Sequence, residues 1–188
     1  MANETQIIQD CLKQDRGAQK KLYELYSGKL FVVALRYMKD RESAQDVLQD
    51  SFVKIFKYLD TFRFDSPLEA WLRKIVVNTA LKALKKDKKL TQSLEGDYMI
   101  SKELHHSNAG FENLAYEHLM EIIGELPEGC RTIFNLYAIE GFKHQEIAKM
   151  LDVTEGTSKS QYSRAKSLLQ EKLAKENYKK TGKIPAKL

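Results

Sequence analysis

Cysteine is scarce in this 188-residue chain. The two cysteines, Cys11 and Cys130, lie far apart and fit no metal-ligand spacing. Both fall at apolar positions of expected helices, which favours buried thiols in a reducing compartment over a disulfide or a zinc site. No apolar run is long enough to span a membrane, and the polar, acidic N-terminus does not resemble a signal peptide. We therefore expect a cytoplasmic protein that does not insert directly into a membrane.

Prolines and strand signals are also rare. Three prolines interrupt the chain, and its apolar residues recur at helical rather than alternating spacing almost throughout. The stretch between Glu95 and Glu128 is acidic, and its first part is polar and weakly periodic. We predict an all-α fold of two small helical domains joined by a flexible linker. The predicted parts are a helical bundle over residues 1–90, the acidic linker over 91–110, a helix-turn-helix bundle over 111–175 and a basic tail over 176–188.

Signatures of catalysis are missing. The sequence contains no glycine-rich phosphate loop, no metal-ligand cluster and no convincing pair of nucleophile and base. We therefore predict no catalytic residue, no metal and no cofactor, and a protein that is not an enzyme.

Basic charge is concentrated in two segments. Residues 71–90 carry net +6 and residues 159–188 carry net +7, so the remainder of a chain with total charge +5 carries −8. Two separate basic patches on an otherwise acidic chain favour two contacts with a polyanion such as DNA. The alternative is that both are solvated helix ends and tails, which are common.

The stretch over residues 140–169 has the pattern of two short helices joined by a tight turn. Ile147, Ala148 and Leu151 share one face of the first helix, and Thr154 is a candidate N-cap for the second. The expected inward face of the second helix consists of Ser158, Tyr162, Ala165 and Leu168 or Leu169. The residues expected to point outward are Glu155, Thr157, Lys159, Ser160, Gln161 and Arg164. A helix with such a small, polar, basic face suits the DNA major groove, although an ordinary helical hairpin has the same spacing.

Two further helices and a loop complete the pattern. The helix around residues 46–59 is strongly amphipathic, with acidic residues first and basic residues last, which also suits the helix dipole without any partner. The loop TFRFDSP follows over residues 61–67, and Ser66 and Pro67 are expected to start the next helix. In that helix Arg73, Lys74, Asn78 and Lys82 are expected opposite the apolar face.

These segments resemble a known family. The stretches ESAQDVLQDSFVKIFKYLDTFR, SPLEAWLRKIVVNTALKALKK and LPEGCRTIFNLYAIEGFKHQEIAKMLDVTEGTSKSQYSRAKSLLQEKL are similar in order and spacing to bacterial RNA polymerase sigma factors of the extracytoplasmic-function (ECF) group. The resemblance covers about residues 10–173. The EGTSKSQ version of the last helix resembles members from Bacteroidetes-type bacteria.

The resemblance implies roles for the first domain. The amphipathic helix matches the segment that docks on the clamp helices of the largest polymerase subunit, with contacts from Asp46, Gln49, Asp50 and Lys54. The loop matches the one that captures a base flipped out of the promoter minus-ten element. In the loop Phe62, Arg63, Phe64 and Ser66 would hold the unstacked base, which needs an aromatic or guanidinium face and hydrogen bonds. In the following helix Asn78 would lie near the base pocket, with Arg73, Lys74 and Lys82 on phosphates.

The resemblance also implies roles for the second domain and for partners. Thr157, Lys159, Ser160, Gln161 and Arg164 would read the minus-thirty-five element. The implied partners are core RNA polymerase, through its clamp helices and flap, promoter DNA and an anti-sigma factor. Ser158 and Tyr162 occupy positions that are usually aliphatic in the family, and Asp152 stands where glycine is common in the turn.

The predicted function is therefore that of a sigma factor, which recruits polymerase to promoters and helps to open them. The alternative is a stand-alone helix-turn-helix regulator of duplex DNA, which would leave the first domain unexplained.

Overall fold

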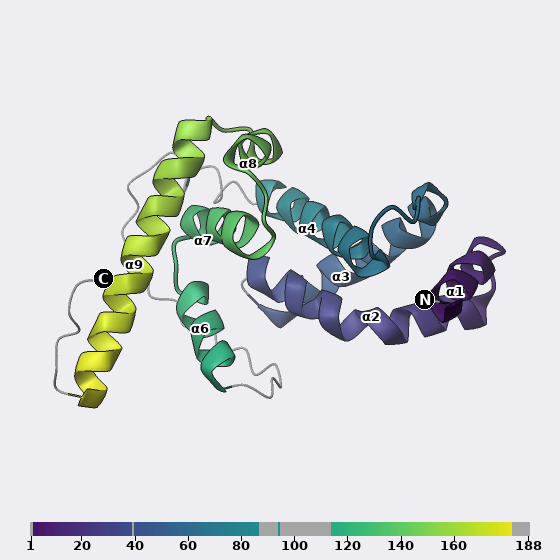
Figure 1. The fold of residues 1–188 in the computed structure, drawn as a ribbon, viewed down its shortest axis with the longest axis horizontal. Coiled ribbons are helices and arrows are strands. Elements are labelled where there is room, and N and C mark those ends of the chain that lie inside the picture. The colour runs from purple at the N-terminus through teal and green to yellow at the C-terminus, as the bar shows by residue number, and fades with distance from the viewer. Residues whose placement is uncertain (1, 39, 87–93, 95–113, 182–188) are drawn as a thin grey trace. The chain divides into compact units, whose positions relative to one another are not determined.

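The computed structural model describes residues 2–38, 40–86, 94 and 114–181 (Figure 1). All regular elements in these ranges are helices, which confirms the all-α prediction there. The chain forms two compact units, residues 1–86 and residues 87–188. None of the helices in the described ranges is both long and apolar enough to cross a membrane.

Unit 1 is a bundle of four α-helices. They are α1 (Ala2–Leu12), α2 (Arg16–Tyr37), α3 (Arg41–Tyr58) and α4 (Leu68–Lys86), with a short 3₁₀ turn η1 (Leu59–Thr61) after α3. Helices α2, α3 and α4 pack against one another, and α1 packs against α2. The centre of the bundle contains fully buried side chains from each of the three, including Leu30, Ile55 and Leu72.

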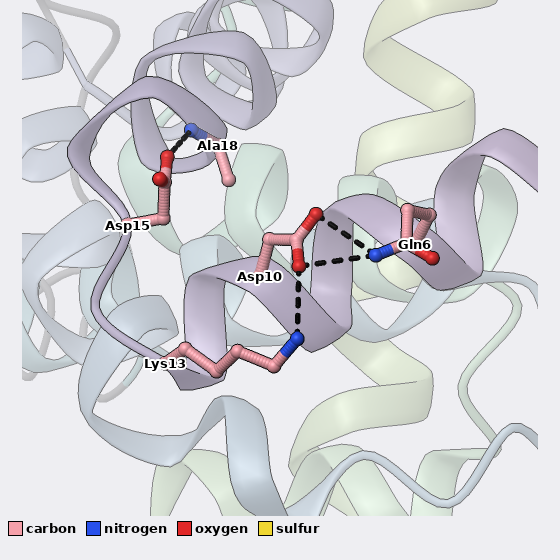
Figure 2. Close-up of polar contacts among 5 residues, drawn as sticks. All are labelled: Gln6, Asp10, Lys13, Asp15 and Ala18. Atoms are coloured by element: carbon pink, nitrogen blue, oxygen red, sulfur yellow. Dashed lines mark hydrogen bonds and ion pairs between the residues drawn. The ribbon is translucent and has the colours of Figure 1, made fainter.

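The connection between α1 and α2 is built from local polar contacts (Figure 2). Asp15 caps α2 by accepting a hydrogen bond from the Ala18 backbone N–H at 2.7 Å. One turn earlier, Asp10 accepts from Gln6 Nε2 at 2.9 and 3.0 Å and from Lys13 Nζ at 3.3 Å. The hydrogen bonds from Gln6 and then Lys13 lower the pKa of Asp10. The N-terminal helix is therefore held by its own side chains and by packing on α2.

Unit 2 contains the predicted helix-turn-helix. Its elements are α6 (Leu114–Gly124), α7 (Glu128–Phe134), the π-helical turn η2 (Asn135–Ile139), α8 (His144–Leu151) and α9 (Glu155–Thr181). Helix α9 packs on α6, α7 and α8 (Figure 1). The core holds Ile122, Ile123, Leu126, Cys130, Ala165 and Leu169. Because α9 continues to Thr181, residues 176–181 of the predicted tail are helical, and residues 182–188 lie outside the described ranges.

Both cysteines are buried thiols, as predicted. Desolvation is the main cause that raises the pKa of Cys11 and of Cys130, so both stay protonated at neutral pH. The linker prediction over residues 91–110 falls outside the described ranges except at Leu94, whose side chain is buried.

The tight turn of the helix-turn-helix depends on Asp152. This residue caps the C-terminus of α8 in the left-handed conformation, with φ 59° and ψ 49°, and its backbone N–H donates to the Ala148 carbonyl. Aspartate tolerates this conformation better than most residues because its short side chain can hydrogen-bond locally. The structure thus explains how this chain does without the glycine that the resemblance led us to expect.

Replacing Asp152 should therefore test the turn. We expect Asp152→Val to lower the free energy of unfolding by about 1–2 kcal/mol, since a β-branched residue is strained at positive φ. Asp152→Gly should leave stability unchanged or slightly raised. Urea denaturation followed by circular dichroism measures both, and a valine variant as stable as the unmodified protein would contradict the turn geometry.

Candidate nucleic-acid interface

The outward face of α3 begins with acidic and amide side chains. Asp46, Gln49 and Asp50 are all exposed, and the buried stripe of the same helix lies opposite them. The helix starts at the N-cap Asp40, whose carboxylate accepts from the Ser43 backbone N–H at 2.7 Å and from the Ser43 hydroxyl at 2.9 Å. The acidic residue in the first turn of the helix, at its positive dipole end, is Glu42.

Val53 belongs to the same face and was missed by the sequence reasoning. It lies three, four and seven residues after Asp50, Gln49 and Asp46, so the four side chains form one continuous surface on α3. Its side chain is 68% exposed, more than any other large hydrophobic residue whose exposure is described. The signal that could have revealed it is an aliphatic residue on the polar side of an otherwise regular amphipathic helix.

Lys54, which the resemblance places among the polymerase contacts, directs its ammonium toward α4. Its side chain is half-buried, and its ammonium donates a 2.9 Å hydrogen bond to Thr79 Oγ1 on α4. Thr79 in turn donates to the Ile75 carbonyl at 2.8 Å. Lys54 lies three residues after the buried Ser51, at the edge of the buried stripe, so the packing of α4 against α3 decides where its long side chain goes.

The loop after η1 presents one aromatic ring and buries the other. Phe62 is 7% exposed and packs between Phe64 and Trp71, with ring centroids 4.8 Å and 5.6 Å away. Phe64 is 54% exposed and has a positive φ of 60°, which is unusual for a bulky residue. Arg63 and Ser66 are exposed beside it. The loop therefore offers the face of Phe64, supported from below by Phe62.

A backbone conformation of this kind costs of order 1–3 kcal/mol and persists only where the surroundings enforce it. Strained residues cluster at ligand-binding sites, so the φ of Phe64 marks the loop as a candidate contact.

The polar stripe of α4 follows directly. Lys74, Asn78 and Lys82 are exposed and recur every four residues, which places them on one side of the helix. The opposite side buries Leu72 and Val76 completely. Arg73 is half-buried and engaged in further interactions. The three exposed residues supply two positive charges and one amide along about two turns of helix.

The start of α9 has the predicted cap. Thr154 Oγ1 accepts from the Thr157 backbone N–H at 3.0 Å, which confirms the N-cap. Lys159 and Ser160 are exposed, whereas Thr157 and Arg164 are half-buried. Lys159 Nζ lies 2.6 Å from Glu155 Oε1, and this contact is the main cause that lowers the pKa of Glu155. Ser163, which the sequence reasoning did not select, is exposed three residues after Ser160.

Gln161 points inward, so its predicted outward orientation is wrong. It is 8% exposed, it accepts a hydrogen bond from Cys130 Sγ at 3.0 Å and it donates to the Leu94 carbonyl at 3.4 Å. The physical reason is helical spacing, because residue 161 follows the buried Ser158 by three positions and lies on the flank of the same stripe. A polar side chain on that flank is satisfied within unit 2 rather than by an external partner.

Metal chemistry has no support in the described ranges, where no three His, Cys, Asp or Glu side chains gather into a group that could hold an ion. What the exposed residues offer is one acidic and apolar helix face, one aromatic loop and two basic helix faces.

Two family descriptions match this chain. The family described as "Sigma-70 region 2" matches residues 22–90, and the family described as "Sigma-70, region 4" matches residues 116–169. The first range covers most of unit 1 and the second covers the helix-turn-helix of unit 2.

Similar proteins extend over nearly the whole chain. The "RNA polymerase sigma-H factor" of Pseudomonas aeruginosa is 28% identical over 178 residues, which is 89% of this chain and 92% of that protein. The "ECF RNA polymerase sigma-E factor" of Escherichia coli K12 is 29% identical over 177 residues, with the same coverage of 89% and 92%. Among solved structures, the sigma factor RpoE of Bartonella quintana, in complex with the anti-sigma factor NepR, has a TM-score of 0.51 at 27% identity and covers 82% of this chain and 95% of that one.

Proposed function

This chain belongs to the sigma-70 family, as a sigma factor of the ECF group that directs promoter-specific transcription, and we propose that its two units divide the work of promoter recognition. Unit 1 binds core RNA polymerase and the minus-ten element, and unit 2 reads the minus-thirty-five element. The observation that carries this division is the match of regions 2 and 4, in that order, to two units that each expose a polar or basic helix face.

The polymerase contact is assigned to α3. Its exposed Asp46, Gln49 and Asp50 lie beside the exposed Val53, toward the N-terminus of the helix. Protein interfaces combine apolar contacts with such polar ones. Lys54 is left out of this contact because its ammonium is already bonded to α4.

The minus-ten contact is assigned to the loop and to α4. Phe64, supported by Phe62, offers a stacking face for an unpaired base, and Arg63 and Ser66 supply hydrogen-bond donors beside it. Lys74 and Lys82 suit phosphates, and Asn78 lies between them with an amide that can read a base edge. Arg73, half-buried on the same helix, supports this surface at its edge.

The minus-thirty-five contact is assigned to the exposed side of α9, with Lys159, Ser160 and Ser163 as the central residues. Thr157 and Arg164 border it and are half-buried. Gln161 is not part of this direct contact, since its side chain is bonded inside the unit.

The division also suits the energetics of a two-part promoter. Each unit alone offers few DNA contacts and should bind weakly. Joining both on one polymerase turns the second contact into an intramolecular event, which raises its effective concentration. The acidic linker predicted over residues 91–110 would span the distance between the two elements.

The chemistry of RNA synthesis belongs to the polymerase, so this chain acts without catalysis of its own and works in the cytoplasm with that enzyme. An anti-sigma factor is a further proposed partner, supported by the complex in which the similar Bartonella sigma factor was solved. The Bacteroidetes-like character of the recognition helix stays a prediction.

One experiment tests the proposal as a whole. Purified full-length protein is mixed with core RNA polymerase of its source bacterium and transcribed on a sheared genomic library. We expect tight polymerase binding and initiation at promoters that share two sequence elements at a constant spacing. Specific binding to duplex DNA without polymerase, and no binding to polymerase, would instead support the stand-alone regulator.

A further inference from the structure

The inner face of the helix-turn-helix is polar and aromatic where an aliphatic contact was expected. We call Tyr137, His144 and Tyr162 the ring cluster. The Tyr137 and His144 rings are stacked, with centroids 4.2 Å apart and an interplanar angle of 12°. Tyr162 packs on Tyr137 at 4.5 Å and lies 5.8 Å from His144. The cluster thus joins η2, α8 and α9.

The ring cluster contains one directional bond between the two helices. His144 Nδ1 lies 2.9 Å from Ser158 Oγ, and Ser158 is completely buried. A buried hydroxyl without a hydrogen-bond partner is unfavourable, and His144 supplies that partner for Ser158. The same bond orients the His144 ring. The hydroxyl can donate to a neutral ring nitrogen or accept from a protonated one, so the bond is available in either state.

The π-helical turn η2 positions Tyr137, the third residue of the ring cluster. The Glu140 backbone N–H donates to the Asn135 carbonyl at 2.9 Å, five residues earlier, which is the π-helical pattern. Tyr137 lies within this turn, and its ring covers the His144 ring while remaining 38% exposed. Turns of this kind are frequent at functional sites because they redirect a side chain from its regular helical place.

The His144–Ser158 bond lies next to the residues of α9 that are proposed to contact DNA. His144 is the first residue of α8, and Ser158 lies in the first turn of α9, directly before the exposed Lys159 and Ser160. Apolar contacts are non-directional, whereas a hydrogen bond prefers a narrow range of distance and angle. The His144–Ser158 bond therefore adds a directional restraint at the start of the helix that carries Lys159, Ser160 and Ser163.

We propose that His144 is a positioning residue for minus-thirty-five recognition, which sets the orientation of α9 through Ser158 and the stacked Tyr137. The proposal rests on the proposed function of unit 2. It concerns selectivity between DNA sequences, not the affinity for polymerase or the contact with the minus-ten element.

Four full-length variants separate the bond from the ring. His144→Phe keeps a ring for stacking but removes the bond, whereas His144→Asn keeps a polar group near the Nδ1 position but removes the ring. Ser158→Ala removes the bond from the other side. The double variant His144→Phe with Ser158→Ala removes both polar groups and leaves no orphaned hydroxyl. Ser167→Ala is the matched control, since Ser167 is an exposed serine of α9 whose hydroxyl donates to the Ser163 carbonyl of its own helix.

The measurement is a selectivity ratio. Initiation is compared between the promoter recovered with the unmodified protein and the same promoter with a scrambled minus-thirty-five element, and melting temperatures are recorded in parallel. We expect His144→Phe and Ser158→Ala to lower the ratio about tenfold, the factor that one buried hydrogen bond can supply. His144→Asn should lower the ratio less than His144→Phe does, and Ser167→Ala should not change it. The double variant should recover melting temperature relative to His144→Phe without recovering the ratio.

The proposal fails if the ratio follows the melting temperature through the whole series, because the pair would then be merely structural. It also fails if His144→Phe keeps the ratio of the unmodified protein while His144→Asn loses it, since the ring and not the bond would then matter. If the unmodified protein did not bind polymerase at all, the proposed function itself would be contradicted. The failure of this proposal and the failure of the proposed function are therefore distinguishable.

Discussion

A Val53→Asp variant is expected to bind core RNA polymerase at least about 100-fold more weakly than the unmodified protein, with little change in folding. Val53 is 68% exposed on the α3 face that also carries Asp46, Gln49 and Asp50. The aspartate would place an unpaired carboxylate in the interface, and taking an unpaired charge out of water costs several kcal/mol, about 3 or more. The affinity can be measured by fluorescence anisotropy of the labelled full-length protein with core polymerase.

The folded state itself should tolerate this change, because surface substitutions away from special features usually alter stability by less than about 0.5 kcal/mol. Leu25→Asp is the matched control. It places the same charge on another exposed aliphatic residue of unit 1, 54% exposed on α2. Equal losses of polymerase binding in the two variants would show that α3 has no special part in the contact.

The second large effect is expected at Phe64. Phe64→Ala should reduce the formation of open promoter complexes by about 5- to 150-fold, since stacking of a base on an aromatic side chain is worth about 1–3 kcal/mol. Polymerase binding should be unchanged because the loop lies outside the α3 face. Permanganate reactivity of unpaired thymines in the minus-ten region measures opening directly.

Phe64→Gly separates the role of the ring from the role of the backbone. Glycine adopts positive φ without strain, so this variant should be at least as stable as Phe64→Ala while opening promoters equally poorly. Tyr58→Ala is the control, because Tyr58 is an aromatic residue of α3 with 46% exposure outside the loop. If both Phe64 variants opened promoters normally, the loop would not be the site of base capture.

Much of the fold was predictable because it depends on local rules. Helical spacing predicted the apolar faces of α3 and α4, and the capping rules predicted Thr154, which accepts the expected backbone N–H. The burial of both cysteines followed from their apolar positions. These features need only the order of residues along one helix.

Sequence patterns are least informative where a long or amide side chain lies at the edge of a buried stripe. Gln161 was predicted to point outward and is buried, and Lys54, expected to contact polymerase, bonds to another helix of its own unit. Spacing gives the direction of the Cα–Cβ bond, but the packing of neighbouring helices decides where a flexible side chain ends. The sequence reasoning missed Val53 for a related reason, since it treated the polar side of α3 as uniformly polar.

The sequence alone determined that this protein is helical, in which order its segments occur, and to which family their motifs are similar, because periodicity, caps and motifs are local properties of the chain. Only the tertiary structure decided that Phe64 is exposed and Phe62 is buried, and that Ser158 is bonded to His144. It also decided that the side chains of Lys54 and Gln161 bond within their own units. Each of these facts depends on contacts between residues distant in sequence or on the precise rotation of one helix against another, and no local pattern encodes either.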